Sequence, residues 1–385
     1  MNSKELLEKY CITNDLSCYD PYDIWKTSLG GRIKATFYEN RYLALIPASL
    51  LTIIDLSLNN RLRLFYQKQE YPIVRAYAIQ ILLNLYKEEN NPKYKEAIES
   101  HLDWLIANSC KGYSGYCWGL NFDWPAGKGI LYDKNTPFTT HTPYVLESFI
   151  SYRNIFNSDK YNYVIKSVFD FLQKDVKVLF EDEESIAFSY GPISDRIVMN
   201  SNSYLLYSYA LFSKFLTIEK ESIDLTIKKL YNFIKTHQRE DGSWLYNPFS
   251  NESFIDCFHS CFVLKNLIKT GNIVQLDDVN SVIQNGYTFL QKNFYDCKTG
   301  LYRRFSMTNK PNVIRFDLYD NAEMLNLSYL LGDVETYQKL SCSIHKKFVK
   351  RDNIYSKVIL GNFKVDKDTF RWAVFPYLYA LSKIN

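Results

Sequence analysis

The chain has 385 residues, 46% of them hydrophobic and 16% aromatic, which is enough for one large domain or two ordinary ones with a packed core. A formal net charge of +4 without a long basic run argues against a nucleic-acid-binding protein. The N-terminus MNSKELLEKYCITND has no apolar signal-peptide core. The most apolar run, 42–58, contains Pro47 and Asp55 and reads as too short and interrupted to span a bilayer. We expect a cytoplasmic protein without a transmembrane segment, with peripheral contact to the inner membrane as an open alternative.

In chain order, residues 1–30 read as an irregular polar segment packed on the body. Six apolar helices then recur, beginning at Arg75, His141, Asn200, Asp256, Asp317 and Phe370. A more charged amphipathic helix precedes each of them, at about 42–58, 93–108, 160–175, 221–237, 278–294 and 335–349. The starts of the apolar helices are separated by roughly 50–70 residues, a spacing typical of two-helix repeats.

This pattern predicts an all-α fold, an (α/α)6 toroid of six helical hairpins. Apolar helices belong in an inner ring, and helices with a charged stripe belong outside. No apolar alternation is long enough for a large sheet, although small β-hairpins are expected in the loops. No Pro/Gly/Ser linker divides the sequence, so residues 1–385 are read as one domain.

In such a ring the inner helices run parallel, so their N-termini and the long loops meet at one mouth. Unsatisfied N–H groups there favour anionic or hydroxyl-rich ligands. N-capping explains about one polar residue per helix, but not a histidine or a second acid one turn later. The polar residues expected at this mouth are Thr139, Thr140, His141, Asn200, Asn202, Asp256, His259, Asp317, Asp320, Asn321, Glu323, Arg371 and Trp372.

The segment FIKTHQREDGSW, ending at Trp244, resembles the QW motif of squalene–hopene cyclases and protein prenyltransferases. The resemblance implies a scaffold joint, in which Gln238 caps a helix end and Trp244 packs on the next hairpin. The stretch FIDCFHSCFVL also resembles the part of prenyltransferase β subunits that supplies a zinc-binding histidine. The partner D-x-C stretch and the acidic DxDD motif of class II terpene cyclases are absent.

A broader resemblance covers nearly the whole chain. It rests on DIWKTSLGG at 23–31, GYCWGLNFDWP at 115–125, TPFTTHTPYVLESF at 136–149, FSYGPISDRIVMNSNSYLL at 188–206 and FRWAVFPYLYAL near the C-terminus. These stretches are similar to uncharacterised α/α-toroid proteins of bacterial surface-polysaccharide gene clusters, which carry prenyltransferase-like repeats. The resemblance implies a role in capsule, O-antigen or exopolysaccharide biosynthesis, with an oligo- or polysaccharide substrate and other biosynthesis proteins as partners. It implies no particular reaction and no cofactor.

Two kinds of acid–base chemistry can be drawn from these residues. Lyases and epimerases abstract a proton next to a carboxylate and need a cation or amide with a His or Tyr, for which Arg196, Asn200, Asn202, His141, His259, Tyr144 and Tyr190 are available. Glycosidases need two carboxylates, for which Asp123, Asp256, Asp317, Asp320 and Glu323 are available. Asp320 and Glu323, on one face of a helix, can alternatively coordinate a cation or simply pair with Arg315 or Arg303. The pattern leaves both chemistries open.

The catalytic candidates are therefore His141, Tyr190, Asp256, His259, Asp320 and Glu323. The substrate-binding candidates are Trp118, Asp123, Trp124, Arg196, Asn200, Asn202, Arg315, Asp317, Arg371 and Trp372. Trp118 and Trp124 lie in a loop punctuated by Gly and Pro and are read as sugar-stacking platforms. Cys257 and Cys261, at i and i+4 on one helix, are read as buried thiols rather than metal ligands.

The favoured hypothesis is a carbohydrate-active enzyme that acts on a surface glycan by elimination, epimerisation or hydrolysis. A non-catalytic glycan-binding or assembly factor is the second hypothesis. An enzyme that acts on a polyprenyl-linked sugar is the third. No phosphate-binding glycine loop and no DxD motif are present, which argues against a conventional glycosyltransferase.

Overall fold

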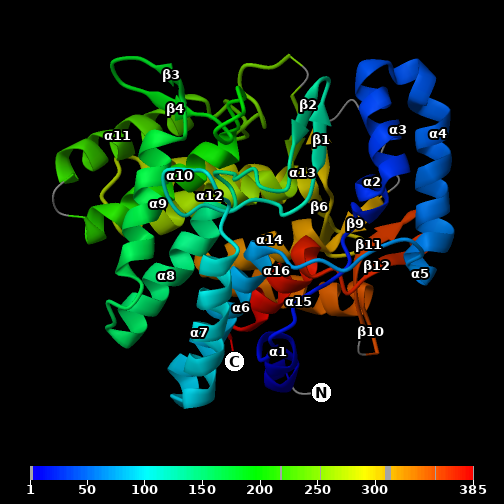
Figure 1. Cartoon of the computed structure of the whole chain (residues 1–385), viewed down its shortest axis with the longest axis horizontal. Coiled ribbons are helices and arrows are strands. Elements are labelled where there is room, and N and C mark those ends of the chain that lie inside the picture. Colours follow the sequence, from blue (N-terminus) through cyan, green and yellow to red (C-terminus); the bar gives the residue numbers. More distant parts are fainter. Residues whose placement is uncertain (1–2, 217–218, 252, 308–313, 352, 385) are drawn as a thin grey trace.

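The computed structural model describes residues 3–216, 219–251, 253–307, 314–351 and 353–384. In these ranges a closed ring of inner helices forms the centre of the molecule, because each inner helix packs on the next and the last packs on the first (Figure 1). The inner helices are α6 (Pro72–Glu89), α8 (Thr142–Phe156), α10 (Met199–Phe215), α12 (Cys257–Gly271), α14 (Leu318–Leu330) and α16 (Phe375–Leu381). The fold is an α/α toroid, as predicted.

The outer helices are α7 (Pro92–Ala107), α9 (Asn162–Lys174), α11 (Lys220–Thr236), α13 (Val279–Phe294) and α15 (Val334–Phe348). Their sequences explain the division into two layers. Outer helices bury one apolar stripe and expose charges, whereas inner helices such as α6 and α10 bury nearly their whole circumference. The alternation of the two patterns along the chain is therefore what closes the ring.

The N-terminal part differs from the prediction in two ways. The first 30 residues, expected to be irregular, include α1 (Ser3–Cys11), which packs on α6, and α2 (Asp23–Lys26). The run 42–58 is not an outer helix of the ring: α4 (Arg41–Ile54), the π-helical turn η1 (Asp55–Asn59) and α5 (Asn60–Leu62) follow α3 (Ser28–Glu39), and α4 packs on α3 beside the ring (Figure 1). The prediction failed because an apolar helix of the right length can lie in either place.

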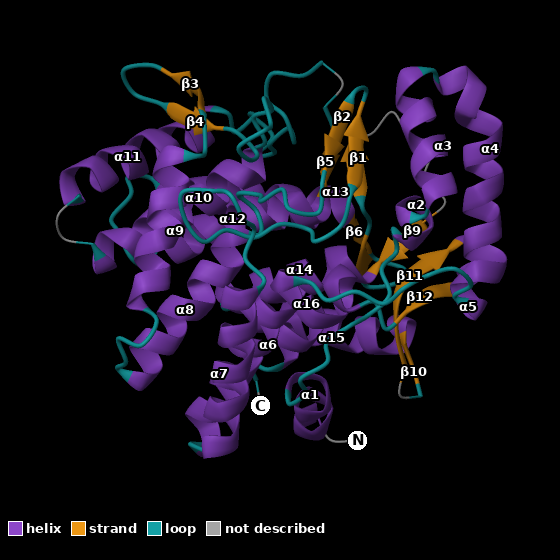
Figure 2. Ribbon diagram, in the orientation of Figure 1, coloured by secondary structure: helices purple, strands orange, loops and turns teal. Residues whose placement is uncertain are grey.

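Short strands occupy the loops, as predicted (Figure 2). Antiparallel pairs form between β1 (Trp124–Gly127) and β2 (Ile130–Tyr132), β3 (Val178–Glu181) and β4 (Ile186–Phe188), β5 (Ile255–Asp256) and β8 (Phe305–Met307), and β6 (Tyr295–Asp296) and β7 (Leu301–Tyr302). A four-stranded sheet was not predicted. In it β11 (Asn353–Ile359) pairs with β9 (Ile314–Asp317), β10 (Val349–Lys350) and β12 (Lys364–Lys367). The turn η2 (Leu360–Asn362) joins β11 to β12, and η3 (Phe370–Val374) leads from β12 into α16.

The QW-type segment is a joint between two hairpins. The Gln238 amide donates to the carbonyl oxygens of Gly242 and Val282, and the Trp244 indole donates to the carbonyl of Ile234. The Trp244 ring lies against α13, where a glycine leaves room for it. The motif therefore has the packing role that the resemblance implies.

The glycine under this ring, Gly286, makes the joint testable. A methyl group on Gly286 would lie 2.8 Å from Trp244 Cζ3 and 2.8 Å from Leu264 Cδ2. We expect Gly286→Ala to lower the free energy of unfolding by about 1–3 kcal/mol, because overpacking forces the ring or the helix to move. Urea unfolding measures the loss. Gly31→Ala is the control, because its methyl group would meet nothing closer than the Trp25 carbonyl oxygen at 3.6 Å, and we expect it to be neutral or stabilising.

Candidate active site

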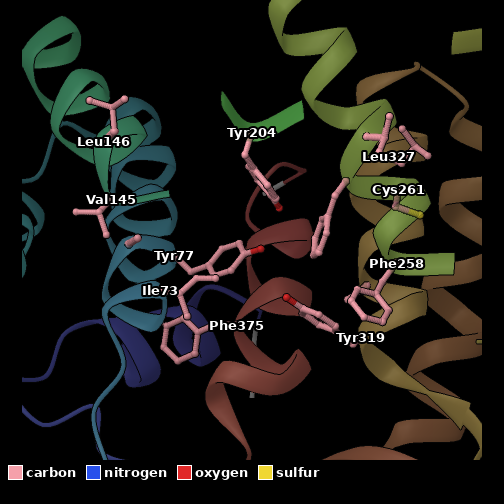
Figure 3. Close-up of a cluster of buried hydrophobic side chains, with 14 of the residues drawn as sticks. Ile73, Tyr77, Val145, Leu146, Tyr204, Phe258, Cys261, Tyr319, Leu327 and Phe375 are labelled. Atoms are coloured by element: carbon pink, nitrogen blue, oxygen red, sulfur yellow. The ribbon is translucent and has the colours of Figure 1, made fainter. Parts of the chain in front are cut away.

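A cavity of about 400 Å³ lies where inner helices begin, at the mouth that the sequence predicts. Its wall is strongly aromatic, and its ionisable side chains are histidine, arginine and tyrosine. The lining residues are Tyr22, Ile73, Leu120, Phe122, Trp124, Thr140, His141, Tyr144, Tyr190, Arg196, Asn200, Tyr204, Tyr246, Phe254, Phe258, His259, Phe262, Tyr319, Arg371 and Trp372. Figure 3 shows Tyr204 and Tyr319 among the side chains that point into the centre of the ring.

His259 and Asp256 form a hydrogen-bonded pair at the start of α12. Asp256 is the N-cap residue, and its Oδ1 accepts the backbone N–H of His259 at 3.0 Å. The same carboxylate contacts His259 Nδ1 at 2.7 and 2.9 Å. The i, i+3 spacing and the helix start together place the two side chains on one face. Because Asp256 is almost fully buried and His259 lines the cavity, the carboxylate orients the ring and the ring is the group that a ligand can reach.

His141 reaches the same cavity from the start of α8. Its Nδ1 lies 3.2 Å from Thr140 Oγ1, and Thr140 Oγ1 lies 3.4 Å from the hydroxyl of Tyr190. Burial, with a smaller contribution from the Arg371 guanidinium, lowers the pKa of His141 to about 3. His141 is therefore a neutral imidazole at physiological pH. Burial also raises the pKa of Tyr190, so its phenol stays protonated and can donate.

The neutral state of His141 can be tested directly. We expect its ring signals in NMR spectra, assigned with His141→Asn, not to titrate between about pH 5 and 8. Because the folded pKa lies below the ordinary value near 6.5, protons bind more tightly to the unfolded chain. The free energy of unfolding should therefore decrease as the pH falls below about 6.5, by about 1.4 kcal/mol per pH unit, until the folded pKa of His141 is reached. A titration midpoint near pH 6 would contradict this environment.

Two polar side chains at the cavity have buried atoms without a hydrogen-bond partner among the described residues. They are the Oδ1 of Asn200 and the Nε of Arg196. Buried polar atoms are nearly always paired in folded proteins, so unpaired ones beside a cavity mark where ligand hydroxyls or carbonyls can bind. The structure thus brings both predicted binding residues to the cavity wall.

Arg371 is held over the cavity by a residue that sequence reasoning missed. Its Nε and one terminal nitrogen donate to the Asp20 carboxylate at 2.6 and 2.8 Å. Although burial raises the pKa of Asp20, the Arg371 and Lys26 cations lower it to about 2, so the pair stays charged. Arg371 also lies over the rings of Tyr22 and Trp372. Asp20 is 351 residues away in sequence, so no local signal pointed to it.

Asp317 and Asp320 do not line the cavity. Both are fully buried and pair with Arg304, at 2.8 Å for Asp317 and 3.0 Å for Asp320. Asp317 also accepts the Trp372 indole N–H at 3.0 Å, and Asp320 accepts the backbone N–H of Phe258 at 3.2 Å. Pairing of Asp320 and Glu323 with Arg303 or Arg315, one of the open alternatives, is wrong, because Arg304 and Lys265 are their partners. The arginine–aspartate cluster lies behind the cavity wall and fixes Trp372 and Phe258 in it.

Glu323 lies deeper in the ring, below the cavity. It pairs with Lys265 and accepts the hydroxyl of Tyr77 at 3.3 Å. The Tyr77 oxygen also lies 3.2 Å from the Tyr144 hydroxyl, which lies 2.6 Å from the Tyr204 hydroxyl (Figure 3 shows Tyr77 and Tyr204). Burial and the Glu323 charge raise the pKa of each of these phenols well above 10. A layer of neutral tyrosines therefore separates the cavity from Glu323.

Besides Asp317, four predicted binding residues lie elsewhere. Trp118 is 0% exposed and its indole donates to the Leu105 carbonyl, so it is a core residue. Asn202 clamps β4 through the backbone N–H and carbonyl of Phe188. Asp123 is exposed and accepts the Lys134 N–H, and Arg315 is exposed and donates to Asn362. None of the four lines the cavity, whereas Trp124 and Trp372 do.

The cysteine pair on α12 is buried beside this site. Burial raises the pKa of both thiols, so Cys257 and Cys261 are protonated. In the ranges that the structure describes, no group of three or more His, Cys, Asp or Glu side chains could hold a metal ion. The acids are already paired with His259, Arg304 and Lys265.

No family model and no curated protein matches the sequence. Solved structures match the fold. A sugar epimerase from a ruminal bacterium superposes with a TM-score of 0.60 at 12% identity, over 81% of this chain and 86% of that one. A D-mannose isomerase gives 0.56 at 13% identity over 82% and 88%, and the GH76 α-mannanase of Bacteroides thetaiotaomicron gives 0.55 at 9% over 91% and 97%. At these identities the likeness establishes a shared α/α-toroid fold.

Proposed function

We propose that this protein is a carbohydrate-active enzyme that moves a proton at a carbon next to a sugar carbonyl, as a sugar epimerase or isomerase does. One observation carries the proposal: the cavity wall holds two histidines and two arginines, and no aspartate or glutamate is among its described lining residues. A cavity with imidazoles and guanidiniums suits enolate chemistry. The epimerase and the isomerase with the same fold lend support by analogy.

The residues can be assigned roles in such a reaction. His259 takes the proton from the carbon, and the Asp256 carboxylate stabilises the imidazolium that forms. The electron pair moves onto the carbonyl oxygen, where Arg196 or Arg371 stabilises the negative charge. In an isomerase His259 then returns the proton to the neighbouring carbon. In an epimerase the enolate first turns over in the cavity, and His259 returns the proton to the other face of the same carbon. His141 and Tyr190 are placed to assist at the hydroxyl and carbonyl oxygens.

Hydrolysis fits the cavity less well. Glycosidases use two carboxyl groups that face the scissile bond. Here Asp256 is engaged by His259, Asp317 and Asp320 by Arg304, and Glu323 by Lys265. None of these carboxylates lines the cavity, so neither the acid nor the base of a glycosidase is presented to a substrate.

The two arginines support a second candidate, β-elimination or C5-epimerisation of a uronic acid. Its first step is the same proton abstraction, with the guanidiniums of Arg196 and Arg371 neutralising the sugar carboxylate. The sequence resemblance to surface-polysaccharide proteins supports a substrate from capsule, O-antigen or exopolysaccharide biosynthesis. A non-catalytic glycan-binding factor of the same machinery would use the cavity without proton exchange.

Solvent-deuterium exchange tests the proposal across several classes of sugar at once. The protein is incubated in D₂O with panels of aldoses, ketoses, reducing disaccharides and uronate oligosaccharides, and proton NMR records the loss of C–H signals beside the carbonyl. Exchange with a new isomer supports the epimerase or isomerase, and a new unsaturated uronate indicates the lyase. Binding by the wild type with no exchange for any sugar would contradict the enzyme proposal and favour a binding factor.

A further inference from the structure

The helix α4 has its apolar side on the outside. Together with η1 it forms one 19-residue helical stretch, Arg41–Asn59, with a mean hydropathy of 1.5 over its most apolar window, of which 6% is buried. The side turned to the protein carries Ala44, Thr52 and Asp55 together with the half-buried Leu51 and Leu56. The exposed side and the turn beyond it carry Tyr42, Leu43, Leu45, Ile46, Leu50, Ile53, Ile54, Leu58, Leu62 and Phe65. Ordinary surface helices show the reverse arrangement.

This exposure is extensive and continuous. Tyr42 is 91% exposed, Ile46 71% and Phe65 89%. Large contiguous apolar surfaces of this kind mark interaction sites. Figure 1 shows α3 and α4 at the edge of the molecule, with α3 on the side of the body and α4 beyond it. The helix predicted at 42–58 is present, and it continues through Pro47 and Asp55.

The charge of the same region is strongly one-sided. Residues 26–70 contain seven Lys and Arg against three Asp and Glu, so this segment alone has the formal net charge of +4 that the whole chain has. A groove of about 1030 Å³ begins where α5 ends. Its cations outnumber its acids, Asp15 and Asp368, and they are Lys9, Arg63, Lys68, Lys350, Lys364 and Lys367.

One cation of the groove, Lys364, is poorly compensated. Burial, with the nearby Lys350 and Lys347 charges, lowers the pKa of Lys364, whose ammonium donates only to a backbone carbonyl among its described contacts. Phe363, at the end of the turn before β12, is exposed and also lines the groove. An apolar helix that ends in a basic, partly apolar groove matches the two layers of an anionic membrane surface, acyl chains and phosphate headgroups.

We propose that the exposed face of α4 docks on an anionic lipid bilayer and lies in its interfacial plane, with the basic groove against the headgroups. Crossing the bilayer does not fit the connections of the helix. Helix α3 has 12 residues, about 18 Å, and carries Arg32, Lys34 and Glu39, so it cannot return across a hydrocarbon core of about 30 Å. At the other end Asn60 bonds to Asp366 of β12, which ties the end of the helix to the body.

A second copy of the chain fits the face less well. Cations flank both ends of α4, with Arg41 at its start and Arg63 and Lys68 beyond its end. Antiparallel packing of two copies would set these like charges together, which is destabilising. An anionic bilayer presents the complementary charge along the whole face. Docking would also hold the cavity close to the lipid headgroups, because α3 packs on β1 and Lys34 lies over the Trp124 ring, which lines the cavity.

Vesicle flotation tests the docking, which does not depend on the reaction proposed above. Full-length protein is floated with vesicles of phosphatidylglycerol and phosphatidylethanolamine, and with neutral phosphatidylcholine vesicles. We expect binding to the anionic vesicles that falls about tenfold or more in Ile46→Glu/Ile53→Glu. We also expect it to weaken in Lys68→Glu/Lys364→Glu and when NaCl rises from about 0.1 to about 0.5 M. Leu225→Glu, an equally exposed leucine on α11, should bind like the wild type.

Two further measurements complete the test: the depth to which α4 enters the bilayer and the oligomeric state of the protein in solution. In Tyr42→Trp the added indole should be quenched by bromine-labelled lipid, whereas the one in Leu225→Trp should not. The variant sites other than the half-buried Lys364 are exposed, so the melting temperatures of variants at these exposed sites should stay close to that of the wild type. Equal binding to neutral and anionic vesicles, or no binding to either, overturns the proposal. So does a stable dimer in solution that Ile46→Glu/Ile53→Glu dissolves, because that result assigns the face to a second copy.

Discussion

Replacing His259 by alanine should reduce the rate of solvent-deuterium exchange into the substrate by about 10²–10⁴-fold, the usual contribution of a general base. The ring is the only imidazole in the described cavity that is oriented by a carboxylate, through the 2.7 Å contact between Nδ1 and Asp256. The loss should appear in kcat more than in KM, because proton abstraction occurs in the transition state. His345→Ala, on the exposed face of α15, is the matched control and should keep full activity.

The Asp256→Asn variant tests the orientation of the His259 imidazole while the imidazole itself is kept. Asparagine is as good an N-cap as aspartate, so the start of α12 should stay folded. Its amide N–H₂ can donate to Nδ1, which would move the imidazole proton to Nε2 and block the base. We expect exchange to fall by about 10²-fold or more, with little change in melting temperature. Activity in His259→Ala within about threefold of the wild type would remove His259 from the mechanism and leave His141 as the remaining imidazole in the described cavity.

The ring of inner helices was predictable from sequence because the required information is local and repeated. Helices apolar on all sides alternate with amphipathic ones, and only an inner ring buries the first kind completely. The same reasoning wrongly placed the run at 42–58 among the outer helices of the ring. Its apolar content resembles that of a helix in the ring, and sequence alone does not say that its leucines and isoleucines face outward while Ala44 and Asp55 face the protein.

The candidate site was predictable where its geometry is set within one helix. Asp256 and His259 meet because they are three residues apart at a helix start. Pairs that the tertiary fold creates were not predictable, such as Arg371 with Asp20, or the acids of α14 with an arginine from the preceding loop. Trp118 and Trp124 lie six residues apart in one loop, yet only Trp124 lines the cavity. The Trp118 indole N–H donates to the carbonyl of Leu105 in α7, which holds Trp118 in the core.

Of the substitutions considered, removal of the Arg304 charge should lower the free energy of unfolding most. Arg304→Met leaves Asp317 and Asp320 buried without their cation, and we expect the free energy of unfolding to fall by about 3–5 kcal/mol. Its neighbour provides the control: Arg303 is 64% exposed in its ion pair with Asp296, so Arg303→Met should cost less than about 1 kcal/mol. Urea unfolding of both variants measures the difference. Equal losses would mean that the Arg304 ion pairs add nothing beyond a surface contact.

The pH dependence of Arg304→Met should identify the cause of its loss. Burial, together with the Asp317 and Asp256 charges, raises the pKa of Asp320 to about 8 even though Arg304 lowers it. Without the guanidinium this pKa rises further, so the folded variant holds a proton that the unfolded chain, with a pKa near 4, releases. Its stability should therefore be highest at low pH and fall as the pH rises through the folded pKa. We expect the deficit relative to the wild type to be smaller at about pH 5 than at about pH 8. A deficit independent of pH would point to lost packing against Trp372 and Phe258 rather than to the unpaired carboxylates.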